Sequence, residues 1–187
     1  MGASLDVTGR TDEQLAAEAA REGSDGPAFV ELVRRYQERV WRICYRLLGN
    51  PHDAQDAAQE VFVRLFTCRG QFAHRSKYST WVHGIAVRTS LTFRRGRGRR
   101  QKRVVTVSGE TLEKAASAEP APALALDLMD MLDTLDEEDR AMLILKYAEN
   151  YSYDELAEIF GLTSSACKMR ISRAREKLQQ RYPDAAL

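Results

Sequence analysis

Helical periodicity runs through most of this sequence. Apolar residues recur every three or four positions over residues 28–48, 54–66 and 81–93, which places them on one face of a helix. Turn-forming residues, such as those at 49–51, separate these runs. The only candidate strand, residues 104–107, is short. We therefore predict an all-α fold of two small helical domains joined by a flexible linker, with a helix-turn-helix in the second domain.

Capping residues predict where the helices begin and end. Thr11 with Gln14, and Ser152 with Glu155, have the spacing of capping boxes. Further N-caps are predicted at Asn50, Ser79, Asp136 and either Thr163 or Ser164, and left-handed helix ends at Gly49, Asn150 and Gly161. These signals agree with the boundaries of the apolar runs.

Charge and composition divide the chain further. The total is nearly neutral, with 28 Lys and Arg against 27 Asp and Glu. Residues 94–103 are basic, whereas residues 127–139 are acidic and are expected to face solvent or a basic partner. The stretch between them is rich in Ala, Ser, Thr, Glu and Pro, so it has little capacity to bury a core. We predict an extension with a short helix at 1–25, a first domain at 26–103, a linker at 104–124 and a second domain at 125–187.

Composition argues against several classes of protein. No apolar run approaches the roughly 18–20 residues of a membrane span, and residues 1–10 lack a signal pattern. We therefore expect a cytoplasmic protein with no membrane insertion. Cys44, Cys68 and Cys167 form no CxxC pair, and the histidines are scattered. We expect buried, reduced thiols, no metal site and no cofactor.

Residues 152–181 have the layout of a helix-turn-helix. A short helix ends at Gly161, a tight turn follows, and a longer helix begins near Ser164. The turn, the cap and the one-sided basic face together favour DNA binding over a merely solvated surface helix. The polar and basic residues placed to reach phosphates or bases are Ser165, Lys168, Arg170, Ser172, Arg173 and Arg175, with Met169 among them.

The first half contains two further unusual surfaces. Residues 53–64 carry acids and amides on one face and apolar residues on the other. The loop from Phe72 to Tyr78 interleaves aromatic residues with cations, which suits single-stranded nucleic acid because bases stack on rings while cations hold phosphates. Trp81 fits either a core position or a stacking platform, and a place at the edge of the core would serve both.

Taken together, these segments resemble the extracytoplasmic-function (ECF) group of bacterial σ70-type sigma factors. The resemblance extends from about residue 28 to residue 181 and rests on six blocks in order. They are FVELVRRY (29–36), LGNPHDAQD (48–56), QEVFVR (59–64), STWV (79–82) followed by IA (85–86), LKYAENYSYDELA (145–157) and KMRISRAR (168–175). Each block alone is unspecific, whereas the ordered set at family-like distances, with a linker in the expected place, is specific.

The resemblance implies a transcription initiation factor that catalyses nothing itself and brings RNA polymerase core to promoter DNA. In the family, one helix docks on the clamp helices of the β′ subunit; its counterpart here carries Asp53, Asp56, Gln59, Glu60, Phe62 and Arg64. The −10 element is recognised and held open by a loop and helix that correspond here to Lys77, Tyr78, Ser79, Thr80, Trp81, Arg88 and Arg95. The second domain binds the β-flap and reads the −35 element with the basic helix described above. An anti-sigma factor is a further candidate partner.

Several positions depart from the family pattern. Gln55 stands where an acid is common in the docking motif. Arg88 and Thr92 replace an Asn and an Asp that are common in the −10 helix, so the −10 sequence of relatives does not transfer in detail. Asp136 replaces a usual Pro but still suits a helix cap, and residues 164–167 replace the usual turn into the last helix. The −35 preference is therefore expected to be individual.

The residues alone leave other classes of function open. A free-standing helix-turn-helix regulator, binding duplex DNA as a dimer without polymerase, would explain residues 152–181 but leave residues 53–64 without a role. A nuclease would need carboxylates clustered in a pocket, whereas the acids here lie along surface helices. An RNA-binding module would need its aromatics on a sheet or on loops, and no sheet is predicted. The short helix after Thr11 fits either a regulatory partner or packing on the first domain.

Overall fold

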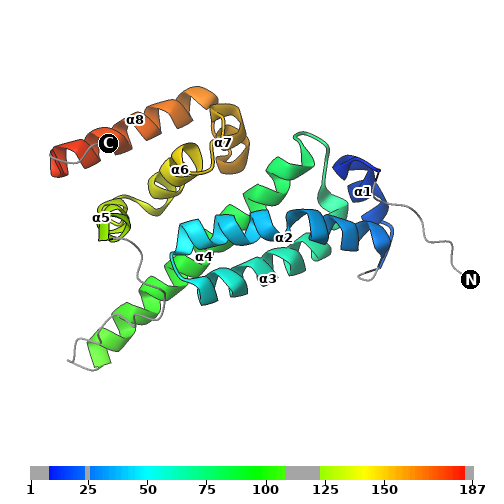
Figure 1. The fold of residues 1–187 in the computed structure, drawn as a ribbon, viewed down its shortest axis with the longest axis horizontal. Coiled ribbons are helices and arrows are strands. Elements are labelled where there is room, and N and C mark those ends of the chain that lie inside the picture. Colours follow the sequence, from blue (N-terminus) through cyan, green and yellow to red (C-terminus); the bar gives the residue numbers. More distant parts are fainter. Residues whose placement is uncertain (1–8, 24–25, 108–122, 184–187) are drawn as a thin grey trace, which may run out of the picture. The chain divides into compact units, whose positions relative to one another are not determined.

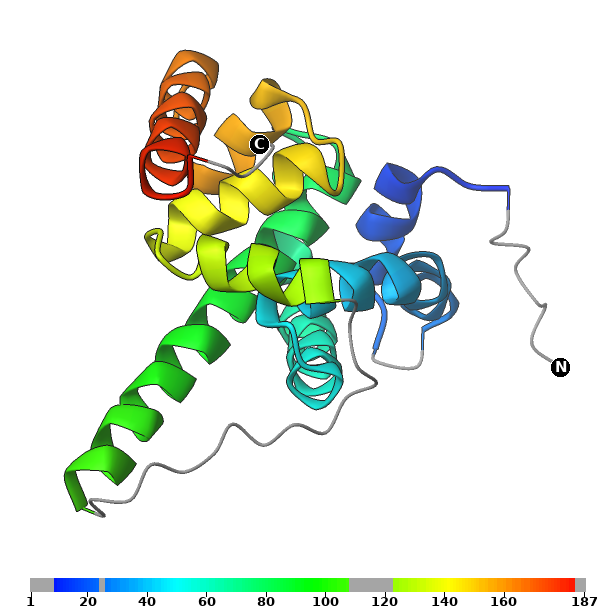
Figure 2. The same ribbon diagram turned by 60° about the vertical axis from the view of Figure 1, so that its left-hand side comes forward.

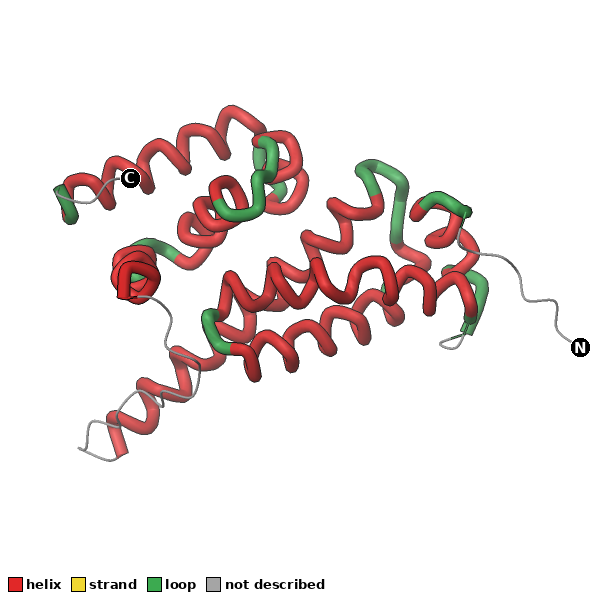
Figure 3. Tube along the Cα trace, viewed as in Figure 1, coloured by secondary structure: helices red, strands yellow, loops and turns green. Residues whose placement is uncertain are grey.

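The computed structural model describes residues 9–23, 26–107 and 123–183, and every regular element in these ranges is helical (Figures 1 and 3). The elements are α1 (Asp12–Ala19), α2 (Pro27–Leu48), α3 (Pro51–Thr67), the 3-10 turn η1 (Arg69–Gln71), α4 (Tyr78–Val107), α5 (Ala123–Leu132), α6 (Glu137–Tyr147), α7 (Tyr153–Phe160) and α8 (Ser164–Arg181). The predicted all-α fold is confirmed.

The chain divides into two compact units between Ser90 and Leu91, inside α4, and each unit is described by itself. Helix α4 continues through Gly96 to Val107, because a glycine weakens a helix by about 1 kcal/mol without ending it. The candidate strand at 104–107, which was also the start of the predicted linker, is therefore helical. The rest of that linker up to residue 122 lies outside the described residues, and the predicted domain limits stay a prediction.

The core of the first unit lies between α2 and α3, which run side by side (Figure 1). Val40 and Ile43 of α2 are completely buried, as are Ala54 and Ala57 of α3. The alanines allow the two helices to approach closely, so that the larger side chains of α2 fill the space between them. Each large aliphatic side chain buried in this way stabilises the fold by about 1.5–3 kcal/mol.

Most predicted helix ends are confirmed. Asn50 Oδ1 accepts hydrogen bonds from the backbone N of His52 at 2.9 Å and of Asp53 at 3.1 Å, and so caps α3. Gly49 before it has φ of 71°, a left-handed conformation that ends α2 with little strain. Both capping boxes form, at Thr11 in α1 and at Ser152 in α7.

Two predicted caps differ from the structure. Helix α4 begins at Tyr78, and its first turn is closed by the hydrogen bond from Trp81 N to Lys77 O at 3.2 Å, so Ser79 lies inside the helix. Asp136 does stand at the N-cap position of α6, but its side chain makes no capping hydrogen bond. Of the two candidates for α8, Thr163 is the cap, since its hydroxyl accepts from Ala166 N at 3.1 Å.

The second unit contains the helix-turn-helix, with α7 and α8 packed against α6 (Figure 2). Met142 of α6, Leu156 of α7 and Cys167 of α8 are completely buried at the centre of this group. Gly161 ends α7 with φ of 67°, and Leu162 N then donates to Ala157 O at 2.9 Å. This left-handed turn sets the direction of α8, which is the helix with the basic face.

The cysteines are free thiols, and two of the three are buried. Burial raises the pKa of the Cys44 thiol to about 11, against a weaker opposing hydrogen bond with Ser90. Cys167 is also fully buried, whereas Cys68 is half-buried. The prediction of buried thiols therefore holds for Cys44 and Cys167.

None of the helices among the described residues is both long enough and apolar enough to span a lipid bilayer.

Candidate protein and nucleic-acid interfaces

One side of α8 presents polar and basic side chains to solvent. Cys167, Ile171 and Leu178 hold the opposite side of the helix in the core of the second unit. Four of the predicted DNA-contacting residues are exposed on the side opposite this core: Ser165, Lys168, Ser172 and Arg173. Met169 lies among them with 54% of its surface exposed, an unusual position for a large apolar residue. We call these five residues the α8 face; an exposed apolar group there is suited to a thymine methyl.

Two other predicted DNA-contacting residues are directed elsewhere. The guanidinium of Arg170 makes ion pairs with Asp139 at 2.6 Å and Glu138 at 3.1 Å. It thereby ties α8 to the acidic first turn of α6. Arg175 is exposed, and its guanidinium lies 5.7 Å from the ring centre of Tyr147 and donates to the Tyr147 hydroxyl at 3.4 Å. The acidic run of residues 127–139 was expected to face solvent or a basic partner. Two of its residues, Glu138 and Asp139, instead pair with Arg170 of α8 in the same chain.

Arg170 therefore has a structural role, which gives a testable prediction. Arg170→Ala should lower the stability of the second unit by about 1 kcal/mol, because the two ion pairs are partly exposed to solvent, and this corresponds to about 4 °C in melting temperature. The Arg170→Ala variant should still discriminate between promoter sequences as the wild type does. Thermal unfolding followed by circular dichroism measures the first effect, and Arg173→Ala serves as the matched control on the same helix. An unchanged melting temperature together with loss of promoter discrimination would show instead that Arg170 reads DNA.

The outer side of α3 carries the residues predicted to dock on polymerase. Asp56 and Gln59 are exposed, whereas Asp53 and Glu60 are half-buried. Glu60 is held by an ion pair with Arg64 at 2.7 Å, one helical turn away. Phe62 is directed away from this side: it is half-buried and lies among apolar residues of α2 and α4.

Val63 was missed by the sequence reading. It is 58% exposed and lies one turn from Gln59 and two from Asp56, so the three side chains form one stripe, which we call the α3 stripe. The docking residues predicted within 53–64 did not include Val63. Helical spacing could have identified Val63 as exposed, because Val61 and Leu65 occupy the buried side of α3 around it.

An aromatic cluster lies at the junction between the loop of residues 72–77 and α4. The ring of Phe72 is 5.1 Å from that of Tyr78 and 5.4 Å from that of Trp81, and Tyr78 is 5.6 Å from Trp81. Trp81 is half-buried, which agrees with a position at the edge of the core, where it could both pack inward and stack on a base. His74 has φ of 53°, a left-handed conformation that turns the loop back toward the helix.

The predicted −10 residues fall into exposed and interior groups. Lys77 is exposed and Ser79 half-buried, whereas Tyr78 and Thr80 are only 3% and 4% exposed. Burial raises the pKa of the Tyr78 hydroxyl, and its ring packs edge-on against Tyr36 at 5.7 Å. Tyr78 and Thr80 are therefore interior residues, and the ring of Tyr78 supports the cluster from the inside.

The last two predicted −10 residues lie farther along α4. Arg88 is exposed, with its guanidinium lying back over Gly84, where a Cβ would be 3.2 Å from Nη1. Arg95 belongs to the second unit; its side chain is 54% exposed and 3.6 Å from Glu138.

Two family models match the chain in the order of its predicted domains. Residues 32–100 match the model for σ70 region 2, and residues 125–178 match the model for σ70 region 4. The first match covers α3 and the aromatic cluster, and the second covers the helix-turn-helix.

Known relatives and solved structures agree with these matches. The chain is 32% identical over 173 residues to the ECF RNA polymerase sigma factor SigW of Bacillus subtilis, covering 86% of this chain and 91% of SigW. The structure of CnrH in complex with the cytosolic domain of CnrY is similar with a TM-score of 0.64 at 23% identity, covering 93% of this chain and 99% of the other. The sigma factor RpoE of Bartonella quintana, solved with the anti-sigma factor NepR, gives a TM-score of 0.60 at 24% identity, covering 81% and 94%.

Proposed function

The chain belongs to the extracytoplasmic-function sigma factors of the σ70 family, and from this we propose how its exposed side chains divide the work of promoter recognition. A sigma factor directs RNA polymerase to promoters, and this is the function of the chain. The observation that carries it is the pair of family matches, to region 2 and region 4, in one chain and in that order. A free-standing regulator is not favoured, because it would leave the region 2 match without a role.

We propose that the α8 face reads the −35 element in the major groove. Lys168 and Arg173 are exposed cations of the kind that bind phosphates and guanine edges. Arg170 was predicted with them, but it pairs with Asp139 of α6, so we assign it a structural role. Arg175 lies over the ring of Tyr147, so we assign it a smaller part in DNA contact. The N-terminal half of α8, which carries Ser165 and Met169, is the part that a helix-turn-helix brings closest to the bases.

The aromatic cluster is proposed to capture a base of the −10 element. Separating one base-pair step costs about 0.6–2.2 kcal/mol, and stacking a base on an aromatic ring returns about 1–3 kcal/mol. Trp81, half-buried at the edge of the cluster, offers the stacking surface, and the exposed Lys77 lies beside it for a phosphate. Tyr78 and Thr80 act indirectly, by fixing Trp81 from the core.

The α3 stripe is proposed to dock on the clamp helices of the β′ subunit, and the second unit on the β-flap. Asp56, Gln59 and Val63 combine a charge, an amide and an apolar side chain on one exposed stripe, which suits a protein partner more than DNA, since the stripe carries no cation. An anti-sigma factor is a further proposed partner, because the similar RpoE was solved bound to one.

The specificity described here requires no chemical step by the chain. We propose that it is not an enzyme and that the polymerase performs all the chemistry. Since bacterial RNA polymerase works in the cytoplasm, we propose the same location for this chain. Pull-down with purified polymerase core tests the proposed function: a stable complex supports it, and binding to duplex promoter DNA with no affinity for core would favour the free-standing regulator.

Trp81→Ala should weaken binding of a single-stranded −10 oligonucleotide by about 5- to 150-fold, because one base loses its stacking partner. Fluorescence anisotropy with the reconstituted holoenzyme measures this affinity. Trp81→Phe keeps an aromatic ring and should lose much less, and both variants should bind polymerase core as the wild type does. If Trp81→Phe lost as much as Trp81→Ala, or if neither lost affinity, base stacking at this position would be ruled out.

A further inference from the structure

Helix α1 precedes the region matched to the σ70 family, which begins at residue 32, and the proposed function has so far given it no role. The helix packs firmly on the first unit: Leu15 is completely buried, and Ala16 and Ala19 are 4% and 1% exposed. It contacts α2 and the turn η1. Of the two uses predicted for this helix, packing on the first domain is therefore the one observed.

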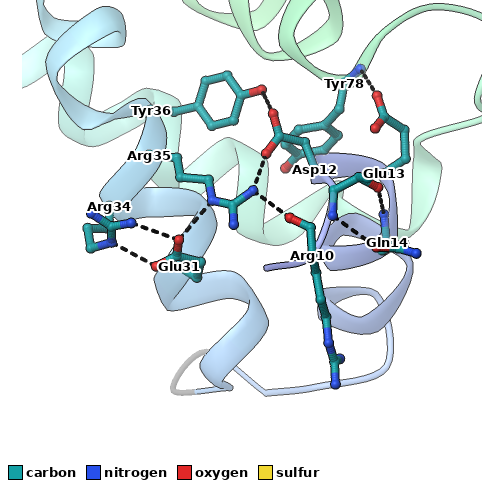
Figure 4. Close-up of polar contacts among 10 residues, drawn as sticks. Arg10, Asp12, Glu13, Gln14, Glu31, Arg34, Arg35, Tyr36 and Tyr78 are labelled. Atoms are coloured by element: carbon teal, nitrogen blue, oxygen red, sulfur yellow. Dashed lines mark hydrogen bonds and ion pairs between the residues drawn. The ribbon is translucent and has the colours of Figure 1, made fainter. Parts of the chain in front are cut away.

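Helix α1 also reaches the start of α4. The carboxylate of Glu13 accepts a hydrogen bond from the backbone N of Tyr78 at 3.2 Å (Figure 4). Tyr78 is the first residue of α4, where backbone N–H groups have no partner within the helix. A carboxylate at this end is also favoured by the helix dipole. The hydrogen-bond acceptor for the first backbone N–H of α4 is therefore Glu13, which lies 65 positions earlier in the chain.

A second set of contacts joins the α1 segment to η1, which precedes the loop of residues 72–77. Arg69, in η1, donates from Nε to Ala19 O at 2.9 Å and from Nη2 to Glu22 O at 3.0 Å. These carbonyls lie at the end of α1 and just after it. The loop of residues 72–77, which carries Phe72, therefore lies between η1 and Tyr78, which are both bonded to the same short N-terminal segment.

The N-terminal segment is itself anchored to α2. Arg35 Nη1 donates to Asp12 Oδ1 and to Arg10 O, both at 2.8 Å, and the hydroxyl of Tyr36 donates to Asp12 as well (Figure 4). Arg35 is in turn held by Glu31 at 2.8 Å. Because these bonds fix α1 against α2, the three hydrogen bonds at the loop ends connect the loop to a rigid support.

We propose that α1 is a positioning element for −10 recognition, with Glu13 and Arg69 holding the two ends of the loop so that the aromatic cluster is arranged before a base arrives. The inference rests on the proposed function, since it concerns how the −10 strand is captured. A loop held in its binding conformation avoids the entropy loss of becoming ordered on binding. Glu13 is a positioning residue: it touches the backbone of Tyr78 and not the nucleic acid.

The test uses the full-length chain in reconstituted holoenzyme. Glu13→Ala removes the acceptor, Glu13→Gln keeps an oxygen acceptor, and Glu18→Ala is the matched control, because Glu18 is a carboxylate of α1 that pairs with Arg10 and not with α4. We expect Glu13→Ala to weaken binding of a single-stranded −10 oligonucleotide by about 3- to 10-fold, a typical effect of losing a helix cap. Glu13→Gln and Glu18→Ala should stay within about twofold of the wild type, and affinity for a −35 duplex and for core should not change.

A second measurement separates loop positioning from general unfolding. Hydrogen exchange of the backbone amides at residues 70–78 should accelerate in Glu13→Ala and in Arg69→Ala, while the amides of α2 stay protected. The inference is overturned if Glu13→Ala binds the −10 strand as the wild type does, or if Glu18→Ala loses as much. It is also overturned if −35 and core affinities fall by the same factor.

Failure of this inference is distinguishable from failure of the proposed function. If the wild-type holoenzyme binds the −10 strand and Trp81→Ala does not, while Glu13→Ala matches the wild type, only the role of α1 is wrong. If the wild-type holoenzyme shows no affinity for the −10 strand, the proposed −10 reading fails, and the role of α1 with it.

Discussion

Asp56→Lys should reduce the affinity of the chain for RNA polymerase core by about 100-fold or more. Asp56 is exposed at the N-terminal end of the α3 stripe, one helical turn before Gln59. A surface that accepts a carboxylate there is expected to be complementary in charge, so a lysine meets like charge, and such contacts cost several kcal/mol. Titration of fluorescently labelled protein with core measures the effect.

The matched control for Asp56→Lys is Glu38→Lys. Glu38 is also an exposed acid of the first unit, but it lies on α2, outside the α3 stripe. The same charge change there should leave core affinity within about threefold of the wild type, since exposed charges are largely screened by salt. Val63→Asp, on the stripe, should resemble Asp56→Lys. Equal losses for Glu38→Lys and Asp56→Lys would indicate a general charge effect and not a docking surface.

The double variant Lys168→Ala, Arg173→Ala should lose at least about 30-fold in affinity for a −35 duplex, because each cation contributes about 1–3 kcal/mol when it contacts DNA. Both side chains are exposed on the α8 face. The salt dependence of binding should also become shallower, by about one unit of logarithmic slope for each phosphate contact removed. Binding assays on holoenzyme at several salt concentrations measure both quantities.

Lys177→Ala is the control for this double variant. Lys177 is exposed on α8 but outside the α8 face, so its loss should reduce affinity much less. Core binding should remain intact in all of these variants. If the double variant instead lost core binding to the same extent as DNA binding, the assignment of the α8 face to the −35 element would be wrong.

The fold could be predicted from the sequence because its signals are local. Asn50 before Pro51, and the capping box that starts at Ser152, act within one helical turn, so the residues that decide the structure are adjacent in the sequence. The left-handed turns at Gly49 and Gly161 follow from the absence of a Cβ. Ser79 failed as a cap for the same kind of reason: the carbonyl of Lys77 begins the helix one residue before Tyr78.

The parts of the site that could not be predicted depend on contacts between distant residues. Nothing near Arg170 in the sequence shows that it pairs with Glu138 and Asp139, about thirty positions away. Nothing near Tyr78 shows that Glu13 bonds to its backbone. Helical periodicity identifies which side of a helix is apolar, but which polar side chain meets which is decided by tertiary packing.

The near-neutral total charge also has an explanation in the structure. Basic and acidic stretches are separated along the chain, and some of them compensate one another inside the fold, as Arg170 does with Asp139. Lys168 and Arg173 remain exposed on the α8 face, while Asp56 is exposed on the α3 stripe. One surface is thus suited to DNA and another to protein, which a single net charge conceals.

The most direct test of the central claim is transcription in vitro by purified polymerase core, with and without the chain, on a library of promoter sequences. The account predicts that adding the chain creates defined transcript starts whose upstream sequences share a −35 and a −10 motif. It further predicts that Lys168→Ala, Arg173→Ala weakens the −35 motif and that Trp81→Ala weakens the −10 motif. Transcript starts that do not differ with and without the chain would contradict the account.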